Sequence, residues 1–143
     1  MKILPWKIGG FKMERENYVS LWIGSIQTVD TLNKYVELPY DEEEGDFLPS
    51  PFLRDFEIDI DDLDEDFIEK VAHDHNKEFL YQLIGGCSYE EMILSRFEAN
   101  QGKQLPKNIN AAILLYNFDY EGKRNEIVNK GYTFTFVGSV SYV

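Results

Sequence analysis

Residues Ala111-Ala-Ile-Leu-Leu-Tyr-Asn-Phe118 form a nearly continuous apolar run. A strand that is covered on both faces shows no alternation of polar and apolar side chains, so a run of this kind is typical of a central strand. The polar segment that follows, residues 119–125, turns the chain. The sequence therefore predicts a sheet built around residues 111–118.

Two further segments have the composition of strands. Residues 18–24, Tyr-Val-Ser-Leu-Trp-Ile-Gly, are β-branched or aromatic on both faces and predict an early, well-covered strand. Near the C-terminus, large side chains alternate with Thr and Ser, which predicts a half-buried terminal strand. The residues predicted to share its buried face are Tyr132, Phe134, Phe136, Gly138, Val140 and Tyr142.

A first helix is predicted over residues 29–38. Thr28 precedes it as a suitable N-cap, and Pro39 ends it because the residue before a proline avoids the α region. Residues 79–84 are so short and so apolar that periodicity does not distinguish helix from strand there.

Two more helices are predicted further along the chain. In residues 64–72, carboxylates fill the first turn, where the helix dipole favours them, and apolar side chains share one face. The pattern Ser88-Tyr-Glu-Glu91 has the form of a capping box, and the helix that it opens is expected to end at Gly102.

The order strand, helices, strand, strand predicts an α+β fold with a mainly antiparallel sheet and helices packed on one face. A length of 143 residues fits a single domain with a core of its own. Met13 begins a stretch that would be a plausible start of its own. We therefore expect residues 14–143 to form the domain and residues 1–13 to be an N-terminal extension.

The composition is strongly acidic. With 26 Asp and Glu against 14 Lys and Arg, the formal net charge is -12, which excludes ordinary binding to nucleic acid and disfavours an anionic membrane surface. The single cysteine, Cys87, excludes an internal disulfide and suits a reducing compartment. No stretch has the length of a secretory apolar region or a membrane span, so we expect a cytoplasmic protein.

The negative charge is concentrated in residues 41–66. This segment holds 13 acids and one base, Arg54, which leaves 13 acids and 13 bases for the rest of the chain. Phe, Leu and Ile side chains are interleaved with the carboxylates, whereas a disordered acidic tract would be poor in them. The segment is therefore expected to be ordered.

A docking surface for a basic partner is the functional interpretation of this segment, because complementary charge raises association rates and orients the encounter. A solvated acidic loop that aids solubility is the alternative. An EF-hand is excluded, because a loop counted from Asp59 needs Gly at position 64 and Glu at position 70, where the chain has Asp64 and Lys70. A looser calcium site is not excluded. The candidate partner-binding residues are Asp41, Glu42, Glu43, Glu44, Asp46, Asp59, Asp61 and Asp62.

No catalytic residue, metal ligand or cofactor site is predicted. His73 and His75 flank Asp74, but no third ligand stands at a recognised zinc spacing. Cys87 lies before a predicted helix, where its thiol pKa could be depressed, yet it lacks the setting of a nucleophile elbow. A small metal- or thiol-dependent enzyme remains as the alternative class of function.

Several short sequence blocks occur in the same order as in a known protein family. Together they resemble the bacterial immunity protein 22 family from about Glu14 to the C-terminus. The resemblance implies a small cytoplasmic protein that binds and blocks a cognate toxin domain, without carrying over any residue-level contact. The blocks are Glu16-Asn-Tyr-Val-Ser-Leu-Trp-Ile-Gly24, Asp64-Glu-Asp-Phe-Ile-Glu69, Ala111-Ala-Ile-Leu-Leu-Tyr-Asn-Phe-Asp-Tyr-Glu-Gly122 and the segment 134–143.

The residues and the resemblance together predict a non-catalytic acidic binding protein, an immunity protein whose partner is a toxin domain with a basic surface. Toxins that cut nucleic acid have basic clefts, so a nuclease is a class of partner that fits. An acidic adaptor unrelated to toxins is the second alternative. The oligomeric state does not follow from the sequence.

Overall fold

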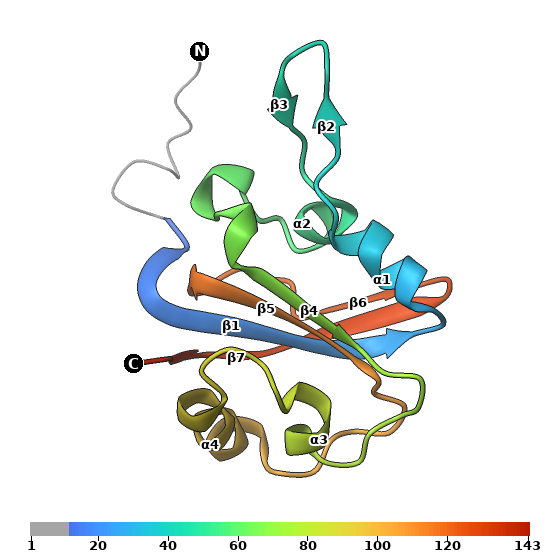
Figure 1. Ribbon diagram of the computed structural model, residues 1–143, viewed down its shortest axis with the longest axis vertical. Coiled ribbons are helices and arrows are strands. Elements are labelled where there is room, and N and C mark those ends of the chain that lie inside the picture. The colour runs from blue at the N-terminus through green and yellow to red at the C-terminus, as the bar shows by residue number, and fades with distance from the viewer. Residues whose placement is uncertain (1–11) are drawn as a thin grey trace.

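The computed structural model describes residues 12–143, which form a five-stranded antiparallel sheet with strand order β4-β5-β1-β7-β6 (Figure 1). The predicted extension, residues 1–13, lies outside the described residues except for Lys12 and Met13. The strands are β1 (Glu14–Ile26), β4 (Ile68–Ala72), β5 (Ala111–Phe118), β6 (Glu126–Asn129) and β7 (Tyr132–Ser141).

The helices cover both faces of this sheet. Figure 1 shows α1 (Val29–Val36) and α2 (Pro51–Asp55) on one side, and α3 (Leu80–Ile84) and α4 (Glu90–Gln101) on the other. The α+β class, the single domain and the antiparallel sheet are confirmed. The expectation placed helices on one face, and the second layer exists because the two central strands, β1 and β5, are apolar on both sides.

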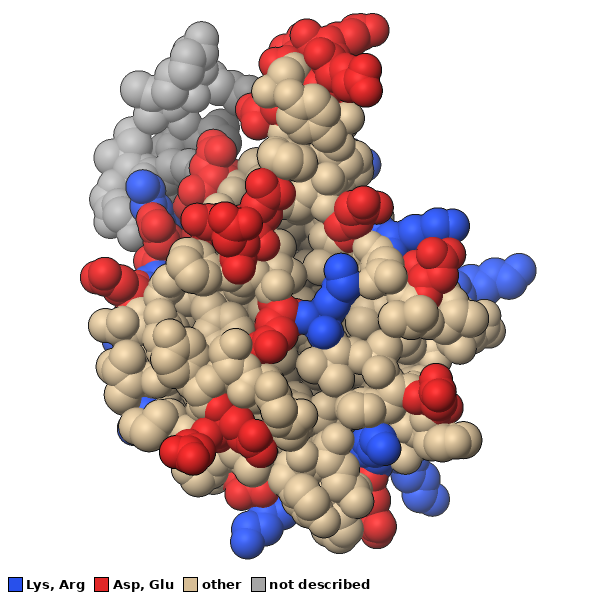
Figure 2. All heavy atoms as spheres, viewed as in Figure 1, with Lys and Arg blue, Asp and Glu red and all other residues tan. Residues whose placement is uncertain are grey.

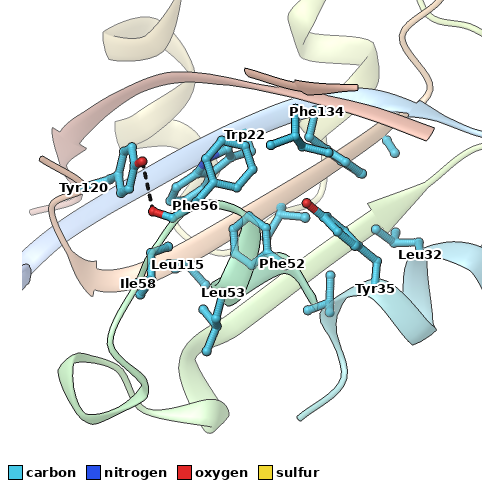
Figure 3. Packing of buried hydrophobic residues seen from close by; sticks show 14 of the residues in the cluster. Trp22, Leu32, Tyr35, Phe52, Leu53, Phe56, Ile58, Leu115, Tyr120 and Phe134 are labelled. Carbon is cyan, nitrogen blue, oxygen red and sulfur yellow. Dashed lines mark hydrogen bonds between the residues drawn. The ribbon is translucent and has the colours of Figure 1, made fainter. Parts of the chain in front are cut away.

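An aromatic cluster fills the space between the sheet and the first helix layer (Figure 3). Trp22 of β1 is fully buried, and its ring meets the edges of Phe52 and Tyr120 at centroid distances of 4.9 and 5.2 Å. Tyr35 of α1 stacks on Phe134 of β7 at 5.3 Å. These contacts fix α1 and α2, and with them the segment that joins the two helices.

The second layer is mainly aliphatic. Leu83 of α3 and both Ile93 and Phe97 of α4 pack against side chains of β1 and β5 that include Leu21 and Leu114. In a strand, successive side chains point to opposite faces, so Leu21 lies in this layer and Trp22 in the other.

A β-bulge divides the terminal strand β7. Trp22 pairs with Phe136, whereas Leu21 pairs with Gly138, so Val137 is an extra residue. As a result, the alternating large side chains predicted to share one face of this strand are divided between the two faces of the sheet. Phe134 and Phe136 pack in the aromatic layer, and Val140 packs in the aliphatic layer.

The predicted helix over residues 64–72 is wrong. The chain instead forms a 3₁₀ turn, η3 (Glu65–Phe67), and then the edge strand β4, which pairs with β5 from Ile68↔Leu115 to Ala72↔Ala111. The Asp64 side chain accepts from the backbone N–H of Asp66 at 2.9 Å, so it caps a short turn rather than an α-helix. Pairing with the open edge of β5 satisfies more backbone groups than one isolated helix turn would.

The other local predictions are largely confirmed. Helix α1 is capped by Thr28 and ends before Pro39, and residues 79–84 are resolved as helix α3. Helix α4 ends at Gly102 as expected, but its N-cap is Tyr89 in a left-handed conformation with φ 60°, not Ser88. In the part of the chain that the structure describes, no helix has the length and apolar character needed to cross a membrane.

The hydroxyl of Tyr120 ties the aromatic layer together and provides a test of it. It lies 3.1 Å from the carbonyl oxygen of Phe56 and 2.8 Å from that of Arg124, and donates within the buried layer. Tyr120→Phe leaves these acceptors unpaired, so we expect the free energy of unfolding in urea to fall by about 1–3 kcal/mol.

Tyr81, which is 51% exposed, serves as the control. Tyr81→Phe should change the free energy of unfolding by less than about 0.5 kcal/mol. Equal effects of the two substitutions would show that the Tyr120 hydroxyl does not hold the layer.

Candidate functional site

A small hairpin projects from the body of the protein between α1 and α2 (Figure 1). Its strands are β2 (Tyr40–Asp41) and β3 (Asp46–Phe47). The Asp41 carboxylate accepts from the backbone N–H groups of Glu43 and Glu44 at 3.0 and 3.4 Å, and Gly45 adopts φ 68°. Asp41 therefore helps to hold the turn through its Oδ1 atom.

The tip of this hairpin is strongly negative. Figure 2 shows acidic side chains gathered there, and Glu42, Glu43 and Glu44 are all exposed. Within residues 12–143 the recorded ion pairs involve Asp119, Asp30 and Glu57, and none involves these three glutamates. Like charges at this spacing repel one another, so the tip lowers stability and leaves its negative field directed at solvent.

An exposed aromatic pair lies at the base of the same hairpin. Tyr40 and Phe47 stand opposite each other across the two strands, with ring centroids 5.1 Å apart, and are 55% and 38% exposed. Leu48 beside them is 38% exposed. Apolar side chains on an acidic hairpin are suited to desolvated contacts with a partner.

A groove of about 390 Å³ lies between the hairpin and the 3₁₀ turns η2 (Ile60–Asp62) and η3. Both apolar and acidic side chains line it, which is the combination that an aliphatic stem with a positive head would fill. The apolar lining residues are Leu38, Phe47, Ile60 and Leu63, and the acidic ones are Glu14, Asp46, Asp61, Asp64 and Glu65.

The structure separates the predicted carboxylates into groups. Asp46 and Asp61 line the groove, and the three glutamates Glu42–Glu44 occupy the hairpin tip. Asp59 caps η2 by accepting from the N–H of Asp61 at 2.9 Å. Asp62 is only 4% exposed and accepts from the N–H of Met13 at 3.3 Å, so it belongs to the interior and leaves the surface set.

Sequence reasoning missed part of the groove. Asp64 and Glu65 were expected to serve a helix start, yet both line the groove because that helix does not form. Glu14 lies on β1, far from the acidic segment along the chain, and no local signal could have placed it there.

Comparison with known proteins bears on what this surface is for. The family model described as Immunity protein 22 matches residues 19–143. The chain belongs to the Immunity protein 22 family. No curated protein and no solved structure matches it. Membership in the family implies a toxin-neutralising role and a cognate toxin as partner.

The histidines of this Immunity protein 22 member are not arranged as metal ligands. The His73 ring Nε2 lies 2.9 Å from the carbonyl oxygen of Leu83, which ties the ring to α3, and His75 is exposed in the following turn. Across residues 12–143, no group of three or more His, Cys, Asp or Glu side chains is placed to hold a metal ion. This arrangement favours neither a zinc site nor the looser calcium site.

Cys87 lies in surroundings unlike those of a nucleophilic cysteine. It is 8% exposed, and burial, together with the charges of Glu69 and Glu90, raises its thiol pKa to about 11. A reactive cysteine needs a lowered pKa and a positive environment. The thiol therefore stays protonated at neutral pH.

The pKa of Cys87 can be tested by alkylation, since it is the only cysteine of the chain. Because only the thiolate reacts, the rate with iodoacetamide should keep rising about tenfold per pH unit between about pH 7 and pH 9.5. In the urea-unfolded chain the rate should level off near about pH 8.5. A plateau below about pH 9 in the native protein would contradict the raised pKa.

Proposed function

We propose that this Immunity protein 22 member is a non-catalytic antidote that binds a basic face of its toxin in the bacterial cytoplasm, using the acidic groove and the hairpin beside it. The observation that carries the proposal is the groove itself. Phe47 of the hairpin and Leu63, which follows η2, both contribute to its apolar lining, and Asp46 and Asp61 line the same groove. Charge complementarity selects a basic protein as its occupant.

The carboxylates steer the encounter in this proposal. Glu42, Glu43 and Glu44 project from the body at the hairpin tip, where their field meets an approaching partner first. Steering of this kind acts on the association rate and is screened by salt over a Debye length of about 8 Å under physiological conditions. In this proposal, the tip sets how fast the toxin associates and how it is oriented, but not how long it stays bound.

The apolar side chains slow dissociation. Tyr40 and Phe47 form an exposed aromatic pair, and aromatic anchors carry much of the binding energy in interfaces. Because most differences in affinity between related complexes lie in the dissociation rate, these rings and the groove set how long the toxin stays blocked.

A nuclease is the toxin class that suits this surface best. An enzyme that cuts nucleic acid needs a basic cleft to hold phosphates, and a row of carboxylates can occupy that cleft or cover its entrance. In this arrangement the antidote inhibits by occlusion and needs no chemistry of its own.

Charge reversal at the hairpin tip tests the steering role. The triple variant Glu42→Lys, Glu43→Lys, Glu44→Lys should lower the association rate with the cognate toxin by about tenfold or more at low salt, and should flatten its salt dependence. Asp41 is left in place because it holds the turn. Surface-plasmon-resonance kinetics at several salt concentrations provide the measurement.

A matched control changes the net charge equally at a distance from the hairpin. Asp74 and Glu78 are exposed and Glu98 is half-buried on the side of α3 and α4, and none of them lines the groove, so their replacement by Lys should leave the association rate within about twofold. If both triple variants slow association alike, the effect comes from net charge and the hairpin is not the docking surface.

Removal of one ring tests the apolar contact. Phe47→Ala should raise the toxin dissociation rate about tenfold or more and change the association rate little, because it removes buried contact area but no charge. Val128→Ala removes apolar atoms from β6, where Val128 is 71% exposed, and should have no effect. A Phe47→Ala variant that dissociates like the wild type would exclude the groove from the interface.

A further inference from the structure

A second pocket, of about 340 Å³, lies on the other side of η3 and is lined mainly by aromatic rings and carboxylates. It sits where η3, β4, the start of α4 and the ends of β5 and β7 meet. Its lining residues are Asp66, Phe67, Ile68, Glu69, Ser88, Tyr89, Tyr116 and Tyr142.

Three tyrosine rings are gathered at this pocket. The centroid of Tyr142 lies 4.4 Å from that of Tyr89 and 5.6 Å from that of Tyr116, and the latter two are 6.0 Å apart. The ring planes are inclined to one another by 35° to 70°, and because Tyr116 is only 6% exposed, the rings open to a ligand are those of Tyr89 and Tyr142. The negative faces of such rings attract cations.

Hydrogen bonds hold two of the three rings in place. The Tyr116 hydroxyl lies 2.8 Å from Glu69 Oε1 and 2.9 Å from the Ser88 carbonyl oxygen, and the Tyr142 hydroxyl donates to Asn117 Oδ1 at 2.6 Å. These two walls are therefore preorganised, which reduces the entropy lost when a ligand binds.

Tyr89 forms the outer wall. It is 54% exposed and adopts φ 60°, a conformation that is uncommon for a bulky side chain. Phe67 of η3, which is 45% exposed, also lines the pocket. Two large rings thus remain open to solvent at a site where they could be covered by a partner.

The carboxylates at this pocket select the charge of the ligand. Glu69 Oε1 already accepts from Tyr116 and from the backbone N–H of Ser88 at 3.2 Å, and Asp66 is exposed at the rim. The nearby guanidinium of Arg96 is engaged by the carbonyl oxygens of Ser141 and Val143 and does not line the pocket. A neutral planar ligand would desolvate the acids without compensation, whereas a cation would pair with them.

We propose that this pocket binds the guanidinium group of an arginine side chain from the toxin. This inference rests on the proposed function for the identity of the partner. A guanidinium is flat, stacks on aromatic rings and donates in its own plane, so it can use the rings and the carboxylates together, which a compact ammonium does less well. Arg15 already shows the arrangement, because it lies 3.6 Å from the ring centroid of Tyr18 while it contacts Asp119 at 2.7 Å.

The position of the pocket also fits the proposed interface. Glu65 lines the acidic groove, and its neighbours Asp66 and Phe67 line the tyrosine pocket, so η3 separates the two by a single turn. One basic face of a partner can therefore reach both.

The first experiment tests the chemistry of the pocket with a defined probe. N-acetyl-arginine methylamide is titrated into the full chain, and the aromatic NMR signals are followed. We expect saturable shifts of the tyrosine signals of the pocket, with a dissociation constant on the order of millimolar, and no saturation with the corresponding citrulline amide, which has a similar shape but no charge. Equal binding of citrulline would overturn the proposal.

A variant at the outer wall makes the test specific. Tyr89→Asn removes the ring, and Asn tolerates positive φ, so the backbone is retained. It should weaken binding of the arginine amide at least about fivefold, whereas Tyr81→Asn, at a tyrosine that is 51% exposed on α3, should not. Phe67→Ala provides a second variant if Tyr89→Asn fails to fold, which circular dichroism will show. Unchanged binding in the folded variant would overturn the proposal.

The second experiment uses the toxin and separates the two claims. Tyr89→Asn should raise the toxin dissociation rate about tenfold while Tyr81→Asn leaves it unchanged. If the wild type protects cells and Tyr89→Asn binds the toxin equally well, the arginine pocket is wrong and the proposed function stands. If the wild type binds the arginine amide but neither binds the toxin nor protects cells, the proposed function is wrong. The claim that the arginine comes from the toxin is then wrong as well.

Discussion

The pairing of β1 with β5 is the interaction on which the rest of this structure depends. The two strands lie at the centre of the sheet and are apolar on both faces, so each face must be covered. Trp22 of β1 organises the aromatic layer on one side, and Leu21 next to it enters the aliphatic layer on the other. Burial of large aromatic rings contributes strongly to stability, so a domain of this size can carry an unfavourable acidic hairpin.

The aromatic layer also positions the proposed docking surface. Helices α1 and α2 are anchored by Tyr35 and Phe52, and the hairpin is the connection between them. An isolated two-stranded hairpin is only marginally stable in water, and the direct opposition of Asp41 and Asp46 weakens this one further. Its presentation therefore depends on the two buried helices at its base, and its tip faces solvent, where we propose that it meets the toxin.

Charge and apolar contact have separate places on this surface. In the proposed interface, the glutamates at the hairpin tip act at a distance, and the groove and the tyrosine pocket act only on contact. A basic toxin would be attracted by the first and retained by the second, which is how a fast and durable antidote complex is built. The buried Cys87 and the ring of His73 tied to Leu83 serve packing in this arrangement.

The sequence by itself determined the α+β class, the strands around residues 18–24 and 111–118, the helix ends at Pro39 and Gly102, and the position of the negative charge, because each depends on neighbouring residues. Only the tertiary structure decided that residues 68–72 form a strand, since a short apolar segment adopts the conformation that an open sheet edge offers it. Only the tertiary structure places Glu14 and Asp61 in the same groove and the ring of Tyr89 beside that of Tyr142. Such sites join residues that are distant along the chain, and no local pattern encodes a contact that only the packing of the whole sheet creates.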